Sequence, residues 1–145
     1  MMNKKKSLLL LIAWMIVIFI FSSMNGDMSS DLSFKTTWLF FWVKDPETLK
    51  IYHYFVRKAA HVTEYLILIG LAYNYFRFTS NDIKKIYLYS FLVSFTYAIS
   101  DEVHQLFVSD RAGAFSDVLV DLIGVLLFLI FMFIKNKYAS SRKSS

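Results

Sequence analysis

The stretch SLLLLIAWMIVIFIFSSM, residues 7–24, decides the class of fold to which this chain belongs. Its 18 residues include no charged side chain. A helix that crosses a bilayer needs about 20 predominantly apolar residues, because the hydrocarbon core is about 30 Å thick. The stretch meets this requirement, and its apolar residues lie all round the helix rather than along one stripe. It therefore predicts a membrane-spanning helix.

Three further apolar runs follow the first one. Residues 59–76 carry one carboxylate, Glu64, and one histidine, His61; residues 86–100 are uncharged, and residues 118–134 contain only Asp121 as a charged residue. Each run is long enough to span a membrane once its polar ends are included. We therefore expect an all-α, polytopic membrane protein that forms a single domain over residues 1–145. Its four transmembrane helices are expected at about residues 7–24, 58–78, 86–106 and 116–134.

The composition agrees with this class of protein. Of the 145 residues, 57% are hydrophobic, 19% are aromatic and only 19% are charged, whereas soluble domains carry roughly 25% charged residues. The chain has no cysteine, which excludes disulfides and cysteine-based zinc sites. Disordered, collagen-like and disulfide-rich classes are therefore excluded.

The distribution of basic residues predicts the orientation in the membrane. With the N-terminus inside, the inner segments hold ten Lys and Arg residues and one carboxylate, Asp82, while the outer side holds six basic residues and ten carboxylates. This is the asymmetry that the positive-inside rule describes. We expect a multi-pass protein of the cell membrane whose N- and C-termini are both cytoplasmic. Membrane topology and anionic lipid explain the net charge of +5, so no nucleic-acid partner is expected.

The longest segment outside the predicted helices is rich in aromatic residues. Over residues 34–56 it includes TTWLFFWV, in which Trp38 and Trp42 share a face if the segment is helical. We expect this segment to form an interfacial or re-entrant helix at the level of the lipid headgroups, the alternative being a loop with an aromatic anchor. Asp45-Pro46-Glu47 predicts a break, with the proline at a favoured first helical position.

Polar residues gather at the outer ends of the last three predicted helices. Helical spacing places them on one face of each helix: Arg57, His61 and Glu64 on the first, Asp101, His104 and Gln105 on the second, and Asp117, Asp121 and Gly124 on the third. An ionised side chain near the centre of a bilayer costs about 3 kcal/mol on insertion scales. We therefore expect these groups to meet inside the bundle and to compensate one another.

Each polar group also has a purely structural interpretation. His61 and Glu64 could form an i,i+3 hydrogen bond that stabilises their helix, and Arg57 could pair with a carboxylate. Asp121 could bond a neighbouring helix at a close approach permitted by Gly124. Asp117 suits a helix N-terminus electrostatically. Two histidines and several carboxylates on one side of a small bundle nevertheless indicate a functional site.

Two motifs resemble one family. RKAAHVTEY, residues 57–65, and SDEVHQLFVSDRAGAFSDVLVDLIG, residues 100–124, look like the polar blocks of the VanZ-like family of small bacterial membrane proteins. The chain departs from the family pattern at Asp121, where Asn is usual, and at Asp110, where Gly is usual before Arg111. The resemblance implies a role in tolerance to teicoplanin-type glycopeptides, and the motifs do not state a mechanism.

Two functional hypotheses remain open. In the first, the protein acts at the outer leaflet and binds or alters lipids, lipid-linked groups or acylated small molecules. In the second, it is an intramembrane hydrolase or transferase on a lipid-linked substrate, with an optional divalent metal. The absence of a through-path for protons disfavours a third class, a proton-coupled transporter. A second copy of the chain could complete the polar face as a homo-oligomer.

The candidate site residues fall into two groups. The catalytic candidates are His61, Glu64, Asp101, Glu102, His104 and Asp117. The ligand-binding candidates are Arg57, Lys58, Tyr65, Gln105, Arg111 and Asp121. No cofactor is required by these motifs, and any divalent metal would be bound by residues from the set His61, Glu64, Asp101 and His104, whose spacings match no known zinc signature.

Overall fold

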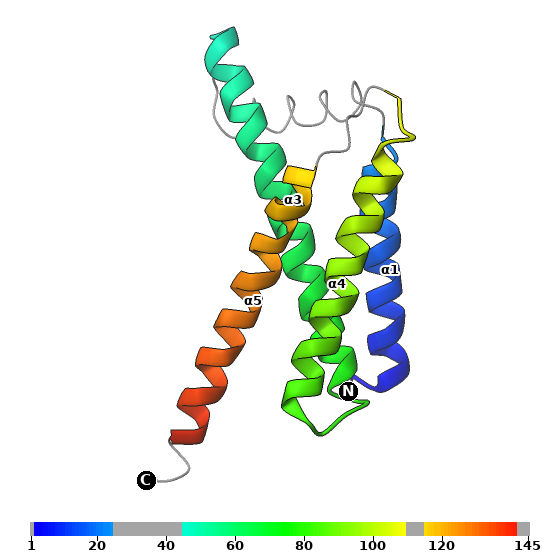
Figure 1. Cartoon of the computed structure of the whole chain (residues 1–145), viewed down its shortest axis with the longest axis vertical. Coiled ribbons are helices and arrows are strands. Elements are labelled where there is room, and N and C mark those ends of the chain that lie inside the picture. The colour runs from blue at the N-terminus through cyan, green and yellow to red at the C-terminus, as the bar shows by residue number, and fades with distance from the viewer. Residues whose placement is uncertain (1, 25–44, 110–114, 142–145) are drawn as a thin grey trace.

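Four helices form the described part of the protein in a computed structural model that describes residues 2–24, 45–109 and 115–141. They are α1 (Lys4–Ser22), α3 (Pro46–Phe76), α4 (Ile83–Gln105) and α5 (Phe115–Ser141) (Figure 1). The all-α prediction is confirmed for these residues. Residues 34–44 of the predicted interfacial segment, with Trp38 and Trp42, lie outside the described ranges, as do Asp110 and Arg111.

The helices run alternately up and down the bundle. The N- and C-terminal ends lie at one end of the molecule, together with the turn between α3 and α4 (Figure 1). The opposite end, here called the site end, holds the last turn of α1, the last turn of α4 and the start of α5. Because α3 packs against α1, α4 and α5, it is the central helix of the bundle.

The core lies along the inner face of α3. Tyr65, Leu68, Ile69 and Ala72 are fully buried there, and they pack against apolar residues from the other three helices: Leu11, Ile18, Ala98, Val118 and Val125. The outward faces of the helices are also apolar. Large exposed hydrophobic side chains include Ile16, Phe19, Leu88, Leu126, Leu127 and Phe131. This distribution fits a surface that faces lipid.

Two of the helices are long and apolar enough to cross a membrane, namely Lys4–Ser22 and Phe115–Tyr138. The other two helices, α3 and α4, carry charged residues along their length.

Interhelical hydrogen bonds join α1 to α3 and to α4. The indole Nε1 of Trp14 donates to the backbone oxygen of Glu64 at 2.9 Å, and the Tyr97 hydroxyl donates to the backbone oxygen of Met15 at 2.5 Å. The amide Nδ2 of Asn74 donates to Ser7 Oγ at 2.9 Å. Interhelical hydrogen bonds of this kind hold helices together where the surrounding lipid supplies no hydrophobic force.

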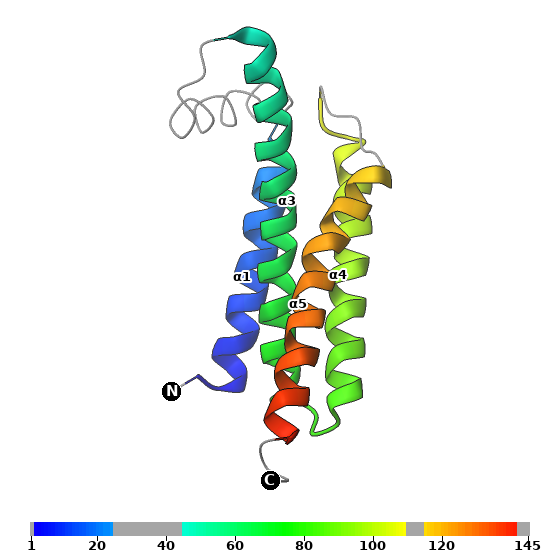
Figure 2. The ribbon, with the colours of Figure 1, turned by 90° about the vertical axis from the view of Figure 1, so that its left-hand side faces the viewer.

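The structure differs from the sequence-based expectation at the start of α3. The helix begins at Pro46, so residues 46–56 belong to α3 and not to a separate interfacial segment. Asp45 is the N-cap, its carboxylate accepts from Thr48 N at 2.8 Å, and Pro46 stands in the first helical turn as expected. No glycine or proline lies between Pro46 and Gly70, so the helix continues through residues 46–56 and extends beyond the ends of its neighbours (Figure 2).

A glycine sets the distance between α3 and α5. A Cβ atom at Gly124 would lie 2.1 Å from the backbone oxygen of Val62 and 2.9 Å from the backbone nitrogen of Leu66. Any side chain there would therefore collide with the backbone of α3. The two helices pack as closely as they do because residue 124 has no side chain.

We expect Gly124→Ala to separate α3 from α5 and to lower the free energy of unfolding by about 3 kcal/mol. The matched control is Gly70→Ala, whose new Cβ would meet only the movable ring of Phe128 at 3.3 Å. The control should change stability by less than about 1 kcal/mol. Thermal unfolding of both variants in detergent measures the difference. Equal melting temperatures would contradict the close contact.

The cap of α3 should respond to pH. Two hydrogen bonds from Thr48, one from its amide and one from its hydroxyl, favour the ionised form and lower the pKa of Asp45 below its usual 3.8. The cap therefore stabilises the first turn above that pH and is lost as the pH falls through the lowered value. Hydrogen exchange at the Thr48 amide, corrected for its intrinsic rate, should show protection at neutral pH that disappears in strong acid. Asp45→Ala should show little protection at either pH.

Candidate functional site

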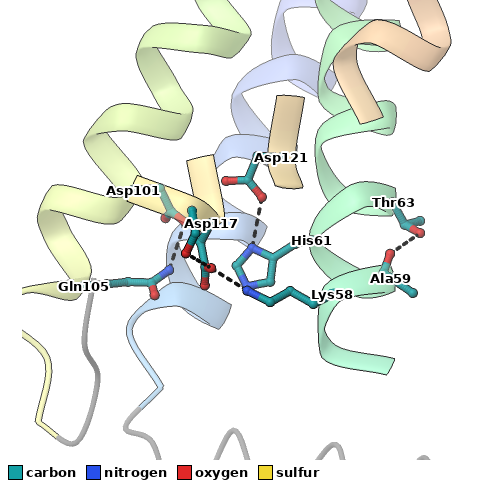
Figure 3. Close-up of polar contacts among 9 residues, drawn as sticks. Lys58, Ala59, His61, Thr63, Asp101, Gln105, Asp117 and Asp121 are labelled. Atoms are coloured by element: carbon teal, nitrogen blue, oxygen red, sulfur yellow. Dashed lines mark hydrogen bonds and ion pairs between the residues drawn. The ribbon is translucent and has the colours of Figure 1, made fainter. Parts of the chain in front are cut away.

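A cluster of buried polar side chains occupies the site end of the bundle (Figure 3). It lies where the middle of α3 meets the last turns of α4 and the first turns of α5. Its buried members are His61, Asp101, Glu102, Gln105, Asp117 and Asp121. The sequence-based expectation that these residues share one region is met by their positions, and the contacts among them show which groups pair.

Two polar side-chain contacts join α3 to α5. Lys58 Nζ forms an ion pair with Asp117 Oδ1, and His61 Nδ1 lies 3.0 Å from Asp121 Oδ1. Lys58 and His61 are three residues apart, and Asp117 and Asp121 are four residues apart, so each pair of residues lies on one helical face. The two helices run in the same direction, so these faces meet in register, with the side chains of α3 pointing at the carboxylates of α5 (Figure 3).

The partner of His61 differs from the one that helical spacing suggested. The i,i+3 pairing of His61 with Glu64 is replaced by the contact of His61 with Asp121 on another helix. Glu64 is half-buried, and its backbone oxygen accepts the hydrogen bond from Trp14. The close approach at Gly124 explains the change, because it brings Asp121, one turn away, within reach of α3.

Further contacts surround the Lys58–Asp117 pair. The Lys58 ammonium lies 5.4 Å from the ring centre of Tyr54, within the range of a cation–π contact. The Ser116 hydroxyl donates to Asp117 Oδ1 at 3.2 Å. Neither Tyr54 nor Ser116 was a candidate from the sequence. The four-residue spacing of Tyr54 and Lys58 could have indicated this contact, because residues four apart on a helix are neighbours.

The polar residues of α4 point to two different places. Gln105 Nε2 donates to Asp101 Oδ2 at 3.2 Å, and both side chains are buried on the inner face with Glu102. His104 instead faces α1, where its Nε2 lies 3.1 Å from Ser23 Oγ and its ring lies 4.6 Å from that of Phe19. The candidate histidines therefore have separate partners, one on α5 and one at the end of α1.

The cationic candidates occupy different positions. Lys58 is engaged with Asp117, whereas Arg57 is half-buried and makes no hydrogen bond or ion pair with the residues that the structure describes. Arg111 falls outside the described residues. Tyr65 is fully buried one turn deeper than His61. The site therefore has an outer rim near Arg57 and an inner part near Tyr65 and Asp121.

The described residues include no group of three or more His, Asp or Glu side chains placed to hold a metal ion. Three of the four metal candidates from the sequence are distributed over separate contacts: His61 with Asp121, Asp101 with Gln105, and His104 with Ser23. Within this part of the chain, the arrangement supplies carboxylate–histidine and carboxylate–lysine pairs and not a metal shell.

The Lys58–Asp117 pair should behave as a buried unit. Lys58→Met leaves the Asp117 carboxylate without its ion partner, and we expect the free energy of unfolding to fall by about 3 kcal/mol. The double variant Lys58→Met/Asp117→Leu removes both charges and should recover most of this loss. Thermal unfolding of the single and double variants provides a double-mutant cycle. Additive losses would show that the two charges do not interact.

One comparison with known proteins gives a match. Residues 7–136 match the family model described as VanZ/LLP1, while no curated protein and no solved structure matches the chain. The matched region contains all of α3 and α4 and most of α1 and α5, together with the whole polar cluster. The resemblance indicated by the motifs at residues 57–65 and 100–124 is thereby confirmed. The chain belongs to the VanZ/LLP1 family of membrane proteins.

Proposed function

We propose that all four described helices cross the membrane and that both termini are cytoplasmic. The end of the bundle that holds the termini carries basic side chains from every helix: Lys4, Lys5, Lys6, Arg77, Lys84, Lys85, Lys135 and Lys137. The positive-inside rule places such an end in the cytoplasm. The site end then lies near the outer leaflet. Helix α4 has 23 residues and is the shortest of the helices that have charged residues in their interior. It extends about 34 Å, which is enough to span the hydrocarbon core of a bilayer.

In this orientation the cluster binds the polar part of a lipid, a lipid-linked molecule or an acylated small molecule. The observation that carries the proposal is Arg57, a half-buried guanidinium without a hydrogen bond or ion pair among the described residues, beside buried groups that are paired. A guanidinium presents donors in a planar fork that matches phosphate and carboxylate. The apolar outer faces of the helices leave an acyl chain free to remain in the lipid.

The cellular consequence that we propose is tolerance to teicoplanin-type glycopeptides. Such molecules combine a polar recognition head with an acyl tail that inserts into the outer leaflet. A site at the outer ends of α3, α4 and α5 would meet the head of an inserted molecule, or the headgroups of the lipids around it. Vancomycin, which has no acyl tail, would not be concentrated at this depth.

The His61–Asp121 contact supports a second candidate function. A carboxylate held 3.0 Å from His61 Nδ1 orients the imidazole and leaves its other nitrogen to accept or donate a proton. This arrangement suits an intramembrane hydrolase or transferase that acts on a lipid-linked substrate. A binding function depends on the Arg57 guanidinium and does not need proton transfer by His61. A catalytic function needs His61.

We expect cells that produce the wild-type protein to be more tolerant of teicoplanin than of vancomycin, relative to cells without it. Arg57→Gln should lose at least about tenfold in affinity for the anionic group, equivalent to about 1.4 kcal/mol, and with it most of the protection. The matched control is Arg77→Gln, which removes an exposed arginine at the other end of α3. Minimum inhibitory concentrations at equal membrane abundance measure the effect.

Equal tolerance in cells with and without the protein would contradict the antibiotic role. Protection that survives Arg57→Gln would contradict the role of the guanidinium. His61→Gln separates the two candidate functions: retained protection favours binding, and loss of protection at equal abundance favours catalysis.

A further inference from the structure

Two polar atoms in the inner part of the site are buried without a hydrogen-bond partner among the described residues. Asp121 is fully buried; its Oδ1 contacts His61, but its Oδ2 has no such partner. Tyr65 is also fully buried, and its hydroxyl has no hydrogen-bond partner among the described residues. A buried polar group left in this state costs about 1–3 kcal/mol, and more when it is charged. The arrangement therefore indicates that a further group is bound there.

These atoms belong to one locus. Tyr65 lies one turn below His61 on α3, and its hydroxyl is within electrostatic range of the Asp101 and Asp121 carboxylates. A tyrosine on a helix points its side chain toward the N-terminus, which here means toward the site end. The locus thus combines residues of α3, α4 and α5 behind the rim formed by Arg57.

The charge of the locus is negative. Asp121 contacts one imidazole, and the side-chain hydrogen bond from Gln105 to Asp101 comes from a neutral amide. The cationic ammonium of Lys58 is engaged with Asp117, nearer the rim. Three carboxylates, Asp101, Glu102 and Asp121, outnumber the two imidazoles near them, His61 and His104, and so attract a cation more strongly than a neutral donor. The group that completes this locus should therefore be positively charged and rich in hydrogen-bond donors.

We propose that this inner locus binds an ammonium group, with Asp121 Oδ2, the Tyr65 hydroxyl and Asp101 as acceptors. An –NH₃⁺ group is similar in size to a water molecule and carries three N–H donors, and these residues supply acceptors in that number. A hard metal cation needs six to eight oxygen ligands, and the described residues do not form a cluster of that kind.

The inference rests on the proposed function, because it names the second group that the same site recognises. The Arg57 guanidinium at the rim suits an anionic group, and the inner locus suits an amine. The ligand is therefore a zwitterionic molecule, or an amphiphile whose head carries both a phosphate or carboxylate and a primary amine. Asp121 is the residue that makes the inner locus selective for a cation.

The test uses the full-length protein in a non-ionic detergent with three amphiphiles of equal chain length. Dodecylammonium supplies both charge and N–H donors, dodecyltrimethylammonium supplies charge alone, and dodecanol supplies neither. We expect dodecylammonium to raise the melting temperature by at least about 3 °C at saturation, with little change from the other two. Ammonium chloride against sodium chloride at equal ionic strength shows whether the free ion suffices or an attached chain is needed.

Variants locate the effect within the protein. Asp121→Asn and Tyr65→Phe should each lower the apparent affinity for dodecylammonium at least about fivefold, because each removes one acceptor. The apparent affinity is read from the dependence of the melting temperature on the dodecylammonium concentration. The matched controls are Glu47→Gln, which removes an exposed carboxylate at the same end, and Tyr89→Phe, which removes an exposed hydroxyl elsewhere. Both controls should respond as the wild type does. Tyr65→Phe keeps the test decisive if Asp121→Asn does not fold.

Three outcomes would overturn the inference. The first is that dodecylammonium and dodecyltrimethylammonium raise the melting temperature equally. The second is that ammonium chloride and sodium chloride have equal effects and dodecylammonium has none. The third is that both site variants respond to dodecylammonium as the wild type does. The proposed function fails separately, through the Arg57→Gln comparison in cells. A protein that protects through Arg57 but ignores amines retains the proposed function and loses only the inner subsite.

Discussion

The structure depends on one constraint, which is that charged side chains in an apolar bundle must meet partners on other helices. Lys58 and His61 meet Asp117 and Asp121 across the contact between α3 and α5. Desolvation makes an isolated charge expensive here, so each pair ties the position of one helix to that of the other. Gly124 permits the approach that these contacts require, because its missing side chain leaves room for the backbone of α3.

The central position of α3 follows from this constraint. It contributes cations to α5, a backbone acceptor to Trp14 of α1 and the largest buried side chain, Tyr65, to the core. The remaining helices pack around it, and α4 adds Asp101, Glu102 and Gln105 to the same buried region. Arg57, at the rim, is the cation that these contacts leave available to a ligand.

Under the proposed function, the two parts of the site divide the recognition of a ligand. The rim supplies a guanidinium at the outer end of the bundle, and the inner part supplies carboxylate and hydroxyl oxygens one to two turns deeper. In that proposal the apolar surface of the helices keeps an acyl chain in the lipid while the head enters the cluster. His61, held by Asp121, lies between the two parts and is the group best placed to transfer a proton.

Local sequence predicted a large part of this arrangement. Long apolar runs indicated four helices, the Asp45-Pro46 pair indicated a helix start within the expected interfacial segment, and the spacing of polar residues indicated which of them share a helical face. It did not predict that residues 46–56 continue α3, because aromatic residues suit an interfacial segment and a helix equally well. It also placed His61 and His104 in one cluster, although His104 contacts Ser23 and Phe19 of the α1 end.

By itself, then, the sequence determined the class of fold, the family and the set of polar residues, because these depend on composition, period and motif order along the chain. Only the tertiary structure decided the pairing. Helical spacing makes Glu64 the nearest neighbour of His61, yet Asp121, 60 residues away, is its partner. Such a contact is set by how closely α3 and α5 approach at Gly124, and the distance between two helices depends on packing that no local pattern contains.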